Sequence, residues 1–144
     1  MFLSAIDQHL SRYSDLGKLF ARLTVAAFML PHGVTKLPFL WGLAQPEATL
    51  TKAGLPASLA VLAYVGEILA PLMILLGWRA RIGALLVIAT MLVALCITVG
   101  TGLFGLDTFG GFKGEKAMMY ITASLAILCL GSGKYSLEPV HEKP

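Results

Sequence analysis

The chain has 144 residues, of which 13% are charged, and its 11 basic and 8 acidic side chains give a net charge of +3. Soluble domains carry about 25% charged residues, whereas this chain is 57% hydrophobic and has a mean hydropathy of +0.80. This composition excludes a disordered chain and an ordinary soluble enzyme domain, and the length allows one domain. Its basic residues form no block with interleaved aromatics, so nucleic acid is not expected as a partner.

Charged residues divide the sequence into four apolar stretches, each close to the roughly 20 residues that a helix needs to cross a bilayer. These stretches lie at 17–39, 55–78, 82–103 and 115–131. Arg22 and Lys36 lie near the two ends of the first stretch, and we expect their side chains to snorkel toward opposite interfaces. The sequence therefore predicts an all-α fold, with residues 1–144 forming a single integral membrane domain built as an antiparallel four-helix bundle.

The connecting segments have the composition of turns and loops. Arg79 and Arg81 belong to a tight basic turn between the second and third stretches, and residues 40–54 contain Gly and Pro and are expected to form a longer loop. Residues 103–114 contain four glycines and three phenylalanines, so a regular helix would be costly there. An interfacial loop and a re-entrant segment both remain open for this part of the chain.

Basic residues are distributed unequally between the two sides of this predicted bundle. Seven Lys and Arg residues fall on the side of the two termini and the 79–81 turn, and four fall on the other side. Positive residues concentrate on the cytoplasmic side of a membrane. We therefore expect a multi-pass protein of a bacterial inner membrane with both termini in the cytoplasm. Residues 1–16 do not resemble a secretory signal and are interpreted as a surface-lying amphipathic helix or a frayed terminus.

Ionisable side chains inside apolar spans are costly and normally face the interior of a bundle. Glu67 is the clearest case because it lies near the middle of the second stretch. His32 and Lys36 share one face of the first helix, next to Pro31, which removes a backbone hydrogen bond. This imidazole and amine could bind an anion, a quinone carbonyl or a proton. Alternatively, they could serve as a packing residue and a membrane anchor.

These groups are expected to meet in the outer half of the bundle. Glu67 would reach His32 or Lys36 if the first two helices pack together, and the alternative is a protonated Glu67 bonded to a carbonyl freed by Pro71. Glu115 begins the fourth helix, where it would join the cluster or only favour the helix dipole. We therefore select His32, Lys36, Glu67 and Glu115 as candidates for ligand binding or proton relay, without assigning a catalytic residue.

The cysteines do not indicate a metal or a redox centre. Cys96 and Cys129 lie at different predicted depths, so a disulfide is not expected, and we interpret both as buried free thiols. Their spacing fits no zinc site, and no metal site is predicted. The sequence also lacks haem ligand pairs, iron–sulfur cysteines and a flavin motif. A bound quinone is therefore the cofactor that remains open, and no covalent cofactor is expected.

Four features, taken in order, resemble the DoxX family of small four-helix bacterial membrane proteins. They are His32-Gly33-x-x-Lys36, then Gly66-Glu67 with Gly77 and the Arg79/Arg81 turn, then the Gly- and Phe-rich stretch before Glu115, and finally Gly131-x-Gly133-x-x-Ser136-Leu137-Glu138. The resemblance extends from about residue 19 to residue 138.

This resemblance implies two kinds of function. The family takes its name from a subunit of an archaeal enzyme that oxidises thiosulfate and reduces a quinone, and other relatives are linked to thiol and oxidative-stress complexes. It therefore implies a membrane subunit of a quinone- or thiol-linked redox complex, with a polar small-molecule site in the outer half of the bundle. The alternative is a non-catalytic scaffold or chaperone. Both imply contact with lipid and with a protein partner or a second copy.

Overall fold

The structure is a computed structural model that describes residues 13–38, 42–102, 105–106, 108 and 110–138. These residues are mostly helical, as predicted, and an isolated bridge joins Leu106 to Phe112. The elements are α2 (Ser14–Val34), α3 (Ala44–Lys52), η1 (Ala57–Val61), α4 (Leu62–Tyr64), η2 (Val65–Leu69), α5 (Ala70–Leu76), α6 (Ala80–Thr98), η3 (Gly100–Gly102) and α7 (Glu115–Leu130).

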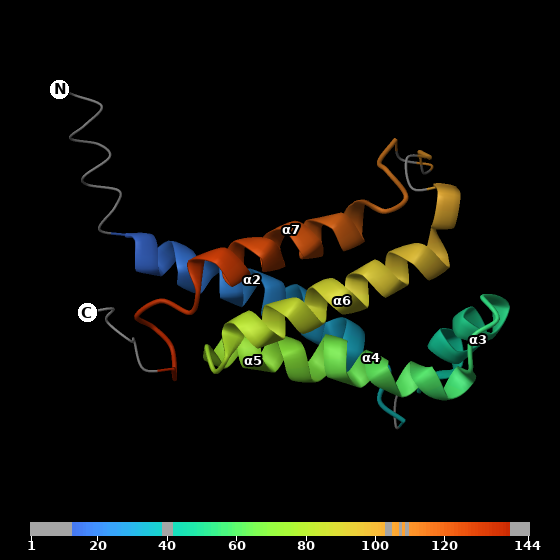
Figure 1. Cartoon of the computed structure of the whole chain (residues 1–144), viewed down its shortest axis with the longest axis horizontal. Coiled ribbons are helices and arrows are strands. Elements are labelled where there is room, and N and C mark those ends of the chain that lie inside the picture. Colours follow the sequence, from blue (N-terminus) through green and yellow to red (C-terminus); the bar gives the residue numbers. More distant parts are fainter. Residues whose placement is uncertain (1–12, 39–41, 103–104, 107, 109, 139–144) are drawn as a thin grey trace.

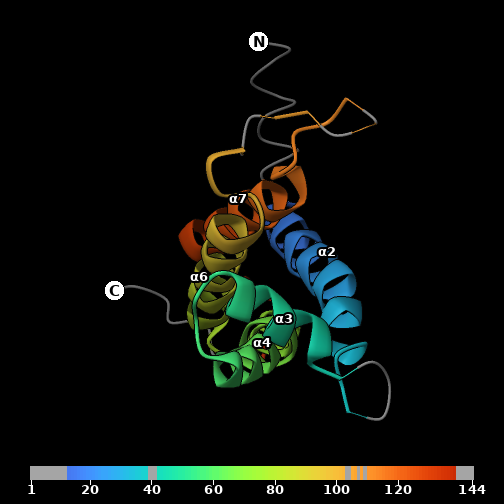
Figure 2. The same cartoon turned by 90° about the vertical axis from the view of Figure 1, so that its right-hand side faces the viewer.

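Four long helical segments lie side by side, formed by α2, by η1 through α5, by α6 and by α7 (Figures 1 and 2). Successive segments run in opposite directions along the long axis (Figure 1). α5 packs against both α2 and α6, and α7 packs against α6 and α2. Buried residues from α2, α5, α6 and α7 form one hydrophobic core.

Small residues allow α5 and α6 to approach each other closely. Ala70, Ala80 and Ala84 are fully buried. A Cβ atom added to Gly83 would lie only 2.8 Å from the backbone oxygen of Ala70. Small residues at such crossings are typical of helices that pack in membranes, where close backbone approach replaces the hydrophobic effect as the source of attraction.

Two helices are long and apolar enough to cross a membrane, Ala57–Leu76 and Ala80–Thr98, and only 39% and 28% of them are buried. An apolar core helix of a soluble protein would be mostly buried, so this outward-facing surface favours contact with lipid. Cys96 on α6 and Cys129 on α7 are free, exposed thiols, and the prediction that they are buried is wrong. That these two helices cross a membrane, together with α2 and α7, stays a prediction.

The helix bounds differ from the predicted stretches in three main places, one of which is α6, which spans Ala80–Thr98 rather than 82–103. α2 begins at Ser14 and ends at Val34, well before residue 39, because the glycine and proline that follow Leu30 weaken its last turn. The predicted loop at 40–54 instead contains α3. Pro46 contributes to the prediction of a loop, but it lies in the first turn of α3, where its missing N–H costs no hydrogen bond. Residues 1–12 and part of the 103–114 segment lie outside the described residues. The predictions for these parts of the chain therefore stay predictions.

Arg22 is buried, so the prediction that it snorkels to the membrane surface is wrong. Only 1% of the residue is exposed. Its Nε donates to the carbonyl of Ile74 at 2.8 Å, and its Nη2 donates to that of Leu75 at 2.9 Å. Its Nη1 donates to the carbonyls of Ser132 and Tyr135 at 2.5 and 2.8 Å. One guanidinium therefore joins α2 to the end of α5 and to the segment after α7.

The end of a helix explains why an arginine occupies this position. The last carbonyls of α5 have no partner within the helix and carry the negative end of its dipole, and a guanidinium offers five N–H donors in a fixed fork. Gly77 ends α5 with φ +68, and a Cβ atom there would lie 2.8 Å from Nη2 of Arg22. Leu137 N–H donates to the carbonyl of Leu76 at 3.1 Å, so the chain after α7 is docked on the same helix end.

We predict that Arg22→Met destabilises the protein and releases the segment after α7. Hydrogen bonds to charged groups contribute about 1.5–3 kcal/mol each, and the variant loses four of them. The expected result is a clearly lower melting temperature in detergent and faster tryptic cleavage after Lys134. Arg79→Met is the control, since this exposed arginine should change stability by no more than about 0.5 kcal/mol. Equal melting of the two variants would contradict the structural role of Arg22.

Candidate functional site

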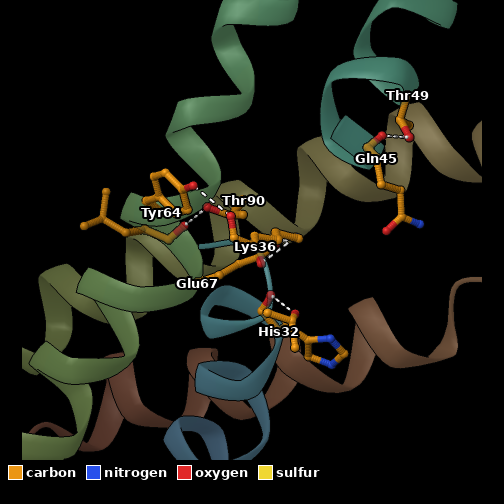
Figure 3. A network of polar contacts seen from close by, with 9 residues as sticks. His32, Lys36, Gln45, Thr49, Tyr64, Glu67 and Thr90 are labelled. Atoms are coloured by element: carbon orange, nitrogen blue, oxygen red, sulfur yellow. Dashed lines mark hydrogen bonds and ion pairs between the residues drawn. The ribbon is translucent and has the colours of Figure 1, made fainter. Parts of the chain in front are cut away.

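Lys36 and Glu67 form an ion pair between the end of α2 and the second helical segment (Figure 3). The Nζ atom of Lys36 lies 2.5 Å from both carboxylate oxygens of Glu67. The side chains are 22% and 10% exposed. The predicted proximity of Glu67 to Lys36 is therefore confirmed, and this carboxylate bonds to an ammonium group rather than to a backbone carbonyl freed by proline.

Glu67 lies in a short π-helical segment, η2. Pro71 has no N–H to donate to the carbonyl of Glu67, and Ala70 N–H instead bonds to the carbonyl of Val65, five residues earlier. Single π turns inside α-helices are rare and occur frequently at functional sites. The irregular backbone of the second segment thus coincides with its one charged residue.

Two glycines allow the neighbouring helices to touch this π segment. A Cβ atom at Gly33 of α2 would lie 2.5 Å from the Ile68 side chain and 2.6 Å from the backbone oxygen of Glu67. A Cβ atom at Gly66 would overlap the Thr90 side chain of α6. The glycines beside His32 and Glu67 in the sequence therefore set how closely α2 and α6 approach the ion pair.

His32 and Glu115 do not join this pair. His32 is exposed, and its ring meets that of Tyr120 on α7 edge-on, with 6.4 Å between the ring centroids. Figure 3 shows its imidazole directed away from Lys36 and Glu67. Glu115 is exposed at the start of α7. Of the four candidates selected from the sequence, the structure brings Lys36 and Glu67 together and leaves the other two apart.

Tyr64 belongs to this site and was not selected from the sequence. Its hydroxyl donates to the backbone carbonyl of Lys36 at 2.8 Å, which holds the segment after α2 against the second helical segment (Figure 3). The available signal was its position three residues before Glu67, since residues at this spacing share a helix face. Tyr64 therefore fixes the backbone from which the Lys36 side chain extends.

A cavity of about 620 Å³ lies beside the ion pair, within the usual size range of small-molecule sites. Its walls come from α3, from η1 through η2 and from α6, and they include Lys36 and Glu67. Apart from these two residues, one glutamine and three threonines, the lining is apolar. The lining residues are Lys36, Gln45, Pro46, Thr49, Leu50, Leu55, Leu59, Ala60, Leu62, Ala63, Val65, Glu67, Leu86, Ala89, Thr90, Val93, Ala94, Ile97 and Thr98.

These features define a helical protein that presents apolar helices outward and holds an ion pair next to an apolar cavity. A family model described as DoxX matches residues 17–101, which is more than half of the chain. The protein therefore belongs to the DoxX family, and this membership together with its apolar helices indicates a membrane protein. No curated protein and no solved structure matches the chain. The match includes the ion pair and the cavity but ends before α7 and the Gly131–Glu138 motif.

We predict that Gly33→Ala destabilises the contact between α2 and the π segment. The added methyl group meets the backbone oxygen of Glu67, which cannot move without the helix, and overpacking of this kind costs about 1–3 kcal/mol. The measurement is the melting temperature in detergent. Gly17→Ala is the matched control because nothing lies within 4 Å of its added methyl group. This control should be as stable as the parent or more so, since alanine is the better helix former.

Equal melting temperatures for Gly33→Ala and Gly17→Ala would contradict this account. Such a result would mean that the close approach of α2 to Glu67 does not limit the size of the residue at position 33.

Proposed function

We propose that the chain is a multi-pass protein of a bacterial inner membrane, folded as an antiparallel four-helix bundle with both termini in the cytoplasm. The alternating direction of the four helical segments supports this topology (Figure 1). The seven-to-four distribution of Lys and Arg supports the orientation. Exposed aromatic and aliphatic side chains on α2 and α7, such as Phe20, Phe28 and Met119, suit helices that face lipid.

This topology predicts the side of the membrane on which each end of the helices lies. A reporter that works only in the cytoplasm should be active when fused after Glu142, and a reporter that works only outside the cytoplasm should be active when inserted at Gly110. Each reporter at the other position serves as the control. The opposite pattern of activities would overturn the proposed orientation, and activity of one reporter at both positions would overturn the number of crossings.

We further propose that the protein is a membrane subunit of a redox complex and binds a quinone, or a thiol-linked redox partner, at the cavity. The observation that carries this proposal is the Lys36–Glu67 ion pair beside the apolar cavity. The residues fit a quinone because they combine an ammonium donor, a carboxylate that can hold a proton, and an apolar volume for a ring and chain.

The two charged residues have different chemical capacities. A bound quinone would supply carbonyl oxygens that accept electrons together with protons. Lys36 Nζ would donate a hydrogen bond to such an oxygen and offset negative charge that develops on it. Glu67 would hold or release a proton at Oε1 or Oε2. Electrons would have to come from a partner protein, because the sequence contains no haem, iron–sulfur or flavin motif.

A second candidate function is that of a non-catalytic scaffold or chaperone for a partner protein. The ion pair also favours this function, since it joins α2 to the second helical segment and polar contacts between helices specify packing in membranes. In that case the pair stabilises the arrangement of the helices and takes no part in binding a small molecule.

The variants Glu67→Gln and Lys36→Met distinguish the two functions. Gln keeps the size of Glu67 but cannot ionise, and Met keeps the apolar stem of Lys36 but removes its charge. If the site binds a quinone, both variants should lose bound quinone by about tenfold or more, the effect of one lost charge-assisted hydrogen bond. Quinone content and melting temperature should be measured on the same purified samples.

Matched substitutions control for the loss of charge alone. Glu47→Gln and Lys116→Met make the same chemical changes at exposed positions outside the cavity lining and should keep the parental quinone content. Parental quinone content in Glu67→Gln and Lys36→Met, with a changed melting temperature, would reject the redox proposal and favour the scaffold.

A further inference from the structure

We infer that the cavity takes an uncharged lipophile with one polar head group, such as an alcohol or a neutral phenol, and excludes carboxylates and ammonium ions of the same chain length. This inference rests on the proposed binding site and specifies the class of molecule that the site accepts.

The charge balance of the cavity is the first argument. Lys36 and Glu67 are the charged residues among those that line it, and their charges cancel whichever of them holds the proton. A charged head group would therefore introduce a net charge into a low-dielectric space, which is costly without a partner. An uncharged head group can accept from Nζ through a carbonyl or hydroxyl oxygen, and a hydroxyl can also donate to a carboxylate oxygen, without changing the net charge.

The remaining polar side chains of the cavity do not form a second site that could bind a charged head group. The hydroxyls of Thr49, Thr90 and Thr98 donate to carbonyls of their own helices at 2.9, 2.8 and 2.6 Å. Their protons are therefore already used. Within the described part of the chain, Gln45 contributes an amide without a hydrogen-bond partner, and an amide is neutral. The strong head-group contacts are thus restricted to the ion pair.

The shape of the cavity is the argument for a single head and a long apolar chain. On α6 the lining residues extend from Leu86 to Thr98, which corresponds to about 18 Å of helix. Glu67 lies near Thr90, toward the Leu86 end of this range, because a Cβ atom added at the neighbouring Gly66 would overlap Thr90. α3 packs against η1 and α6. Aliphatic side chains such as those of Leu59, Leu62 and Val93 are among the lining residues, so the walls suit a hydrocarbon chain.

Photoreactive probes with equal twelve-carbon chains test this inference. An alcohol, a carboxylate and an ammonium probe, each with a diazirine in the chain, are added to the purified full-length protein in lipid nanodiscs at about pH 8. Labelling of the tryptic peptides 53–79 and 82–113, which contain 14 of the 19 residues that line the cavity, is measured by mass spectrometry. We expect the alcohol to label these peptides at least about tenfold more than either charged probe.

Charge variants should change this preference in opposite directions. In Glu67→Gln the unneutralised Lys36 should favour the carboxylate probe, and in Lys36→Met the unneutralised Glu67 should favour the ammonium probe. Glu47→Gln and Lys116→Met should keep the parental order. Variants that still favour the alcohol would show that the ion pair does not set the preference and would overturn the inference.

The parent protein provides a test that does not depend on whether the variants fold. If it prefers the carboxylate or the ammonium probe, the inference fails while the binding site stands. If none of the probes labels the two peptides, the proposed site itself fails. The two failures are therefore distinguishable in one experiment.

Discussion

The arrangement of the helices depends on the hydrogen bonds that the buried Arg22 guanidinium donates to backbone carbonyls. Its four hydrogen bonds reach carbonyls at the end of α5 and in the segment after α7, positions separated from it by more than 50 residues. Carbonyls at a helix end have few partners within the helix, and unsatisfied backbone groups are costly in an apolar environment. An arginine surrounded by carbonyl dipoles needs no carboxylate beside it, and Gly77 leaves the space that it requires.

The ion pair of Lys36 with Glu67 holds the C-terminal end of α2, so this helix is connected to the second segment by two basic side chains, one within it and one just after it. The two contacts differ in their chemistry. Arg22 is always charged and its donors are occupied by backbone groups, which suits a permanent structural contact. Lys36 and Glu67 bond to each other rather than to the backbone and line a cavity, which suits a site for a ligand. This contrast is why the proposed function is assigned to Lys36 and Glu67.

The π segment connects backbone geometry to this site. Pro71 removes the N–H that would otherwise donate to the carbonyl of Glu67. Gly33 and Gly66 allow α2 and α6 to pack closely against the π segment. Tyr64 holds the backbone of Lys36. Each of these features acts on the position of one carboxylate. A buried carboxylate is stable only with a partner of good geometry, so the same features that specify packing also prepare the head-group end of the cavity.

The sequence by itself determined where most of the helices lie, because the positions of charges and apolar runs are local properties of the chain, and it indicated that Glu67 needs a partner. It did not predict α3, because a proline such as Pro46 is compatible both with a loop and with the first turn of a helix. Only the tertiary structure decided that Lys36 rather than His32 pairs with Glu67, that Arg22 is buried, and that residues of α3, η1 and α6 line one cavity. These outcomes depend on which helix ends and faces meet, and hydrophobic periodicity does not specify that.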